Sequence, residues 1–158
     1  MVFISHTTKN HKLALKFADS LSSANVSYWI APECVDKGKD YVDEIVWAIK
    51  RCEYFVLLLS EASQKSSQVR KEVDFAIRYK KKIIPVKLGS CKISERYEYL
   101  LADIQIENIT NTKNPDFSSI VDKCKLGEKV VTLEITSTPK RNILIMKGDY
   151  QENLDTFL

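Results

Sequence analysis

Glycine and proline are scarce in this sequence, which contains four of each in 158 residues. Such low numbers argue against long disordered stretches. Neither a GxxxxGK(S/T) motif nor a GxGxxG motif occurs, so nothing supports phosphate binding by a glycine-rich loop. The four cysteines form no CxxC pair, and the two histidines lie far from most of them in the chain, so no metal site is expected.

Long apolar runs are also missing. The longest, YFVLLL at 54–59, is far too short to span a bilayer, and the chain opens on MVFISH without the features of a secretory signal. Free cysteines fit a reducing compartment, so the sequence predicts a cytoplasmic protein without membrane contact. The net charge of +3, from 24 basic and 21 acidic residues, is too balanced to indicate nucleic-acid binding.

Short apolar runs alternate with amphipathic segments through most of the chain. Strands are predicted at 2–5, 26–31, 54–60, 82–88 and 104–108. Helices are predicted at 11–24, 41–52, 66–80, 94–102 and 116–124. This alternation predicts an α/β fold with a parallel sheet. Pro85 indicates an outer position of the fourth strand or a local break in its pairing, and Tyr41 is expected to face inward from its helix.

The last part of the chain has a different pattern. EKVVTLEITS and RNILIMK alternate between apolar and polar residues like two strands, which predicts a β-hairpin at 128–147. A domain at 1–125 is therefore expected to carry an extension at 126–158. The hairpin could pack on the sheet, mediate oligomerisation or begin a further domain, and the sequence leaves these alternatives open.

One carboxylate lies in an unusual position for a soluble helix. In the helix at 66–80, the apolar stripe consists of Val69, Val73, Ala76 and Ile77 at i, i+3, i+4 spacing. Glu72 lies on or beside this stripe. Either it is a boundary residue that leans out to solvent, or it points into a cleft and takes part in chemistry.

The expected sheet places this carboxylate near a crevice. In open parallel sheets, ligands bind beyond the carboxyl ends of the strands, at the point where the strand order reverses. For the order 2-1-3-4-5, that point lies between the first and third strands. The residues that leave these two strands are Ser5, His6, Thr7, Thr8 and Ser60. Glu72 would lie on the second turn of the following helix, at the same edge.

Four segments resemble bacterial TIR domains in the same order along the chain. They are VFISHTTKNHKLALKFADSL, VSYWIAPECVDKGKDYVDEIVWAI, YFVLLLSEAS and SSQVRKEVDFAIRYKKKIIPVKL. The resemblance covers about residues 1–125. It implies a flavodoxin-like TIR fold, with a five-stranded parallel sheet of order 2-1-3-4-5 and helices on both faces. The segment 32–40 is similar to the family's BB loop.

The resemblance also implies roles for individual residues. Glu72 matches the glutamate with which enzymatic TIR domains cleave NAD+, and the same members often have an aromatic residue where Gln68 stands. Nucleotide-contacting or pocket-bordering positions of the family correspond to Ser5, His6, Thr7, Thr8, Trp29, Asp36, Gly38 and Lys39. From the residues alone, Trp29 also fits core packing, Gly38 a turn, and Asp36 and Lys39 solvated or partner-contacting positions.

Two functions of different classes follow from this resemblance. The first is an NAD+ nucleosidase or cyclase that releases nicotinamide and forms ADP-ribose or a cyclic isomer in bacterial antiphage immunity. NAD+ would then be the substrate, no separate cofactor would be needed, and activity would depend on self-association through the 32–40 loop. The second is a non-catalytic scaffold for TIR–TIR contacts. Either protein could work with a fused or separate sensor or effector.

Overall fold

The computed structural model describes residues 1–125, and the hairpin predicted at 128–147 lies outside this range. The sheet has five strands in the order β2-β1-β3-β4-β5, and every neighbouring pair is parallel. The strands are β1 (Val2–Ser5), β2 (Tyr28–Trp29), β3 (Tyr54–Leu59), β4 (Lys82–Leu88) and β5 (Glu107–Ile109). This arrangement confirms the predicted order and its reversal between β1 and β3.

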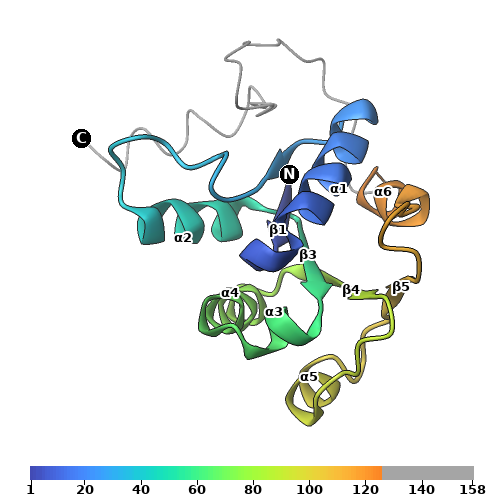
Figure 1. Ribbon diagram of the computed structural model, residues 1–158. Coiled ribbons are helices and arrows are strands. Elements are labelled where there is room, and N and C mark those ends of the chain that lie inside the picture. The colour runs from blue at the N-terminus through green and yellow to red at the C-terminus, as the bar shows by residue number, and fades with distance from the viewer. Residues whose placement is uncertain (126–158) are drawn as a thin grey trace.

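Helices cover the sheet on two sides (Figure 1). They are the 3-10 turn η1 (Thr8–Asn10) and the helices α1 (His11–Ser23), α2 (Tyr41–Arg51), α3 (Glu61–Lys65), α4 (Ser67–Arg78), α5 (Glu95–Leu100) and α6 (Ser118–Lys125). On one side α1 lies next to α6, and on the other α2 packs against α4. The helix that carries Glu72 is therefore held between the sheet and α2.

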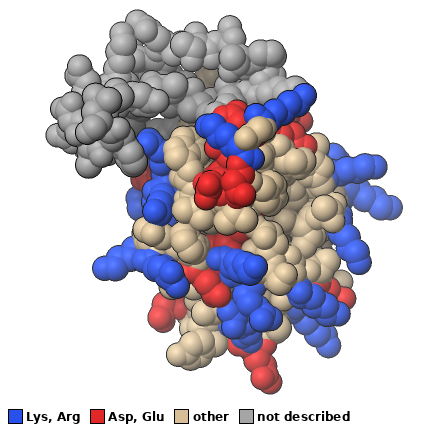
Figure 2. Space-filling view, turned by 90° about the vertical axis from the view of Figure 1, so that its left-hand side faces the viewer, with Lys and Arg blue, Asp and Glu red and all other residues tan. Residues whose placement is uncertain are grey.

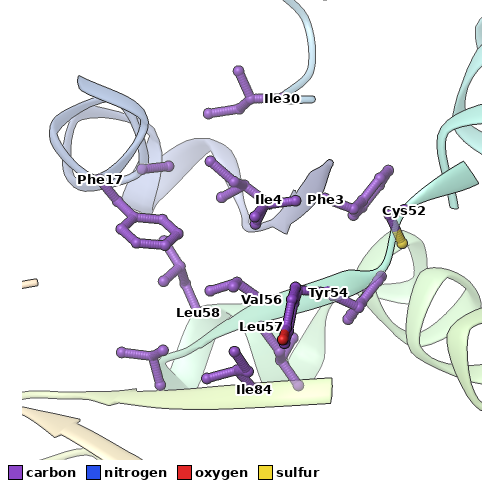
Figure 3. Close-up of a cluster of buried hydrophobic side chains, with 14 of the residues drawn as sticks. Phe3, Ile4, Phe17, Ile30, Cys52, Tyr54, Val56, Leu57, Leu58 and Ile84 are labelled. Carbon is purple, nitrogen blue, oxygen red and sulfur yellow. The ribbon is translucent and has the colours of Figure 1, made fainter. Parts of the chain in front are cut away.

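The centre of the core is β3, which is buried along its whole length between β1 and β4. Burial on both faces explains why its sequence is an unbroken apolar run. Beside it, the ring of Phe3 stacks on Phe55 at 5.2 Å and on Trp29 at 5.0 Å. Figure 3 shows part of the buried core, in which labelled side chains of β1, β3 and β4 lie near Phe17 of α1.

Two strands differ from their predicted bounds. β2 contains two paired residues, whereas a strand was expected at 26–31, because β2 has β1 as its single neighbour and the chain turns after Ile30, whose carbonyl accepts the Cys34 N–H. β5 begins at Glu107 instead of residue 104, because Ile104 closes a turn onto the carbonyl of Leu101. Apolar composition extends beyond the residues that form ladder hydrogen bonds.

The pairing of the fourth strand explains how it accommodates Pro85. β4 lies inside the sheet, but β5 pairs only with its last three residues, Val86–Leu88. Pro85 pairs on the β3 side, opposite Leu57, and therefore lies in the half of β4 that has one neighbour. The ladder with β3 runs through Pro85 without a break, and β4 is an inner strand, so neither predicted alternative was correct. The proline is accommodated because β5 begins to pair only at Val86, and proline lacks the N–H for a ladder bond on that side.

Helix α3 was not predicted, and it separates β3 from α4. Its first turn is closed by a reciprocal pair of bonds, in which Ser60 Oγ accepts the Ser63 N–H and Ser63 Oγ accepts the Ser60 N–H. The next serine then begins α4, where Ser66 Oγ accepts the Val69 N–H at 3.2 Å. Within α4, Ile77 is 40% exposed, so its expected inward position was wrong.

Loss of the α4 cap should destabilise the helix that carries the candidate carboxylate. We expect Ser66→Ala to lower the free energy of unfolding by about 1 kcal/mol, because the Val69 N–H in the first turn of α4 would lose its side-chain acceptor. Chemical denaturation measures this change. Ser67→Ala is the matched control, since Ser67 is exposed and is the first helical residue; an equal loss in both variants would contradict the capping role.

Candidate functional site around Glu72

Glu72 is directed into the protein rather than toward solvent. It lies on the second turn of α4 and is 7% exposed. One carboxylate oxygen accepts a hydrogen bond from Ser5 Oγ at 2.6 Å, and the other accepts one from Gln68 Nε2 at 3.0 Å. The end of β1 and one turn of α4 therefore hold the carboxylate in a single orientation.

Burial sets the electrostatic character of this carboxylate. Removal from water raises the pKa of Glu72 above its ordinary value, while the hydrogen bonds from Ser5 and Gln68 act in the opposite direction. The ionised form is thus incompletely solvated. A positive charge that develops beside it would be stabilised more strongly than by a carboxylate in water.

A small cavity of about 90 Å³ adjoins Glu72. Its wall is formed by Phe3, Ile4, His6, Thr8, Trp29, Ala31, Pro32, Tyr41, Gln68 and Glu72. The cavity has room for about three water molecules. The cavity is much smaller than a nucleotide, so most of such a molecule would have to lie outside it.

Tyr41 was expected to face inward, but the structure places it at this cavity. It is the first residue of α2, is 46% exposed and lines the cavity with Glu72. Its pKa is raised, first by partial burial and then by the negative charge of Glu72. A residue that opens a helix has no preceding turn to pack against, so the apolar stripe of α2 does not determine its direction. Tyr41 is a site residue that the sequence pattern did not reveal.

Trp29 both packs in the core and borders the cavity, which are the two roles that the sequence left open for it. Its ring is buried against Phe3, and it also lines the cavity. Among the described residues, its indole Nε1 is buried without a hydrogen-bond partner. Buried donors are normally satisfied, so this unpaired N–H is an exception in the described part of the chain.

The residues at 6–8, which follow β1, do not all lie at the cavity. His6 and Thr8 line the cavity. Thr7 is turned away, and its Oγ1 donates to Asn10 Oδ1 at 3.0 Å. Of the nine predicted nucleotide-contacting residues, the cavity wall itself therefore includes His6, Thr8, Trp29 and Gln68, and Ser5 touches the carboxylate from behind.

The three predicted residues of the 32–40 loop lie away from the cavity wall. Lys39 Nζ pairs with Asp36 at 3.0 Å and with the buried Glu44 at 3.4 Å, and these contacts order the end of the loop. Gly38 has φ +91°, a conformation that favours glycine, and a Cβ there would meet no neighbouring atom. Gly38 is thus required by the turn, and the loop remains accessible to a partner.

A second, larger hollow of about 560 Å³ lies across the turn at 7–10. It opens at the carboxyl ends of β3 and β4 and includes Lys9, Lys12 and Lys16. Glu61 is the acidic residue among those that line it. At its wall, Ser60 Oγ donates a hydrogen bond to Asn10 Oδ1 at 2.7 Å. Three lysines and one glutamate give the wall of this basic groove a net positive charge.

Neither a metal-binding cluster nor a membrane-spanning helix is found in residues 1–125. No group of three or more His, Cys, Asp or Glu side chains in this part of the chain could hold a metal ion. No helix there is long and apolar enough to cross a membrane. Figure 2 shows acidic and basic side chains interspersed over the face it presents, as expected for the small net charge.

Comparison with known families identifies the fold. The family model described as TIR domain matches residues 2–121. Among solved structures, the TIR domain of a Toll-related receptor from Hydra magnipapillata is 13% identical with a TM-score of 0.63, covering 79% of this chain and 94% of that one. No curated protein matches the sequence significantly.

Two further structures show the range of proteins with this fold. The TIR domains of the activated Roq1 resistosome, which recognises the pathogen effector XopQ, are 16% identical with a TM-score of 0.60, over 79% of this chain and 96% of that one. A CMP N-glycosidase from Clostridium botulinum is 16% identical with a TM-score of 0.55, over 78% of this chain and 97% of that one. At such identities the likeness concerns the fold alone.

Proposed function

Because this chain belongs to the TIR domain family, we propose that it is an enzyme that cleaves the nicotinamide–ribose bond of NAD+, with Glu72 as its catalytic residue. The observation that carries the proposal is the buried carboxylate of Glu72, oriented by Ser5 and Gln68 at the wall of a cavity. A carboxylate left exposed on a helix surface would not have two side-chain donors aimed at it.

The proposed chemistry needs one carboxylate and no general acid. As the bond between the ribose C1′ and the nicotinamide nitrogen breaks, both of its electrons leave with nicotinamide, which departs as a neutral molecule. The ribose becomes an oxocarbenium ion, and the ionised Glu72 stabilises its positive charge. Attack by water gives ADP-ribose and a proton. Attack by a nitrogen of the substrate's own adenine gives a cyclic isomer and a proton.

The walls of the cavity support this reaction in two ways. Trp29 and Tyr41 limit the access of water to the ribosyl cation, and a less hydrated carboxylate interacts more strongly with it. The unpartnered indole N–H of Trp29 can donate to a ribose hydroxyl or to the nicotinamide carboxamide. Thr8 and Gln68 supply further polar groups at the same wall.

Most of the substrate would be bound outside the cavity, which is too small for a dinucleotide. We propose that a neighbouring molecule's 32–40 loop contributes to this outer part, so that turnover depends on assembly. Val42 lies beside that loop and is 62% exposed. It offers an apolar contact for a second copy. In this scheme the enzyme acts in the cytoplasm in bacterial antiphage immunity, alone or with a sensor.

The direct test is nicotinamide release from NAD+ by purified protein at high concentration, with and without a crowding agent. Because one protein of similar fold is a CMP N-glycosidase, cytosine release from CMP should be measured in parallel. We expect nicotinamide and no cytosine, and chromatography of the remaining nucleotide distinguishes hydrolysis from cyclisation. If cytosine is released instead, NAD+ is not the substrate. Glu72 would then be the catalytic residue of a nucleotide N-glycosidase.

The basic groove should contribute to substrate binding. We expect the double variant Lys9→Ala/Lys12→Ala to raise KM for NAD+ about fivefold with kcat nearly unchanged, because exposed charges of this kind each contribute less than about 1 kcal/mol. Initial-rate kinetics at low salt measure the change. Lys65→Ala, an exposed lysine elsewhere, is the control, and an unchanged KM in the double variant would place the diphosphate away from this groove.

A non-catalytic scaffold is the second candidate function. It is favoured by the accessible 32–40 loop and by the exposed Tyr41 and Val42 at the start of α2. A scaffold would self-associate without releasing nicotinamide in any assembled state. Light scattering during the nicotinamide assay therefore separates the two candidates.

A further inference from the structure

Two histidines and a glutamate form a hydrogen-bonded chain that leads from the surface to the Glu72 cavity. His6 follows β1 and lines the cavity, His11 is the first residue of α1, and Glu33 lies in the loop after β2. His6 Nε2 lies 2.8 Å from His11 Nδ1, and His11 Nε2 lies 2.7 Å from a Glu33 carboxylate oxygen. The remaining nitrogen, His6 Nδ1, faces the carbonyl oxygen of Ile4 at 3.4 Å.

The number of protons on this chain follows from its three contacts. Glu33 and the Ile4 carbonyl are acceptors, so His11 Nε2 and His6 Nδ1 must each carry a proton if both contacts are to be hydrogen bonds. The contact between the two rings then needs one further proton, on either His6 Nε2 or His11 Nδ1. Two neutral imidazoles carry two protons in total, and the chain needs three. All contacts are satisfied when the pair holds one extra proton.

The other possible states leave a contact unsatisfied. With two neutral rings, two protons serve three contacts, so one contact always lacks its hydrogen; when His6 Nε2 donates to His11 Nδ1, for example, the bare His6 Nδ1 faces the lone pairs of the Ile4 carbonyl. With two imidazolium rings, two N–H groups oppose each other across 2.8 Å. One shared proton also gives an ion pair with Glu33. The geometry thus favours a singly protonated pair over both alternatives.

The surrounding charges indicate where that proton resides. Burial is the largest effect and lowers the pKa of His6; a positive charge on His11 lowers it further, while the Ile4 carbonyl and the negative charge of Glu33 oppose the decrease. The remaining titratable groups at the cavity are Glu72 on α4 and Tyr41 on α2, whereas the neighbouring Lys9 and Lys12 line the groove on the other side of the turn. The proton therefore belongs on His11, next to Glu33, and His6 is neutral with its proton on Nδ1.

We propose that His11 and Glu33 are positioning residues, which hold one proton between them and His6 and so fix the ring and tautomer of His6 in the wall of the Glu72 cavity. Because Glu33 belongs to the 32–40 loop, the same chain ties the start of that loop to the cavity. When the proton is lost, one of the three contacts lacks its hydrogen, and the tautomer of His6 is no longer fixed. The catalytic consequence rests on the proposed function; the hydrogen-bond chain does not.

Nuclear magnetic resonance tests the chain directly, because His6 and His11 are the only histidines in the sequence. In ¹⁵N-labelled full-length protein, we expect one ring to show a protonated Nδ1 and an acceptor Nε2, and the pair to take up its first proton in one shared step. Glu33→Gln should move this step to lower pH, because it removes the negative charge that contacts His11. Glu95→Gln, an exposed carboxylate on α5, should leave it unchanged.

Enzyme kinetics test the positioning role. Nicotinamide release should fall as pH rises through the shared step, and Glu33→Gln should move this falling limb to lower pH by the same amount. Two histidines that titrate independently and ignore Glu33→Gln would overturn the inference. A shared step in a protein whose assembled wild type releases no nicotinamide would overturn the proposed function, and with it the positioning role, while the proton count would stand.

Discussion

Glu72→Gln should reduce nicotinamide release at least about 100-fold, the loss typical when a group that stabilises transition-state charge is removed. Glutamine has nearly the same shape and can still accept a hydrogen bond from Ser5 and contact Gln68. It lacks the negative charge that would stabilise the ribosyl cation. The reduction should appear in kcat, because the cation does not yet exist in the bound ground state.

The same variant should fold at least as well as the wild type at neutral pH. Burial raises the pKa of Glu72, which means that its ionised form costs free energy in the folded state. Replacing it with a neutral amide removes this cost, and a gain of about 1 kcal/mol is typical where a functional group opposes stability. Thermal unfolding measured beside activity would show that loss of turnover is not loss of structure.

A matched control lies on the same helix. Asp74 is exposed two residues later on α4 and pairs with Arg96 at the surface. Asp74→Asn makes the same carboxylate-to-amide change without affecting the cavity, so its turnover should equal that of the wild type. If Glu72→Gln also keeps the wild-type rate, Glu72 is only a buried helix residue and the enzyme proposal fails.

The position of Glu72 could be predicted from the sequence because two independent patterns agreed on it. The helical spacing of Val69, Val73 and Ala76 placed Glu72 beside the apolar face, and the strand order placed that face near the crevice. The structure agrees with both, with Glu72 buried on α4. Neither pattern could identify Ser5 as its donor, since that contact joins residues 67 positions apart.

Other features have no periodic signal that a sequence could show. Helix α3 has the short polar sequence EASQK, and its start depends on reciprocal bonds between Ser60 and Ser63. The chain from His6 through His11 to Glu33 joins three segments that converge only after the sheet has formed. Tyr41 was misplaced because it begins a helix, where the direction of a side chain is set by the preceding loop. The assignments of Asp36, Gly38 and Lys39 to nucleotide binding stay predictions, since these residues lie outside the cavity wall.

Ser5→Ala should move the rising limb of the pH profile of turnover to higher pH, so that the loss of rate is largest at the low-pH end of the profile. The ionised form of Glu72 is the one that would stabilise the ribosyl cation, so turnover rises with pH through the pKa of this residue. Ser5 donates to the carboxylate at 2.6 Å and opposes the increase in pKa that burial causes. A hydrogen bond to a charged group contributes about 1.5–3 kcal/mol, and its loss favours the protonated, inactive form.

Two measurements should therefore change over the same pH range. The folded protein holds the Glu72 proton more tightly than the unfolded chain, so the stability linked to this group is present at low pH and is lost as pH rises from 4.5 through the raised pKa. Ser5→Ala should extend that loss to higher pH, together with the rising limb of turnover. Ser27→Ala removes another buried hydroxyl and should alter neither profile. A reduction in rate by the same factor at every pH would mean that Ser5 acts on the substrate itself, because only an effect through the ionisation of Glu72 depends on pH.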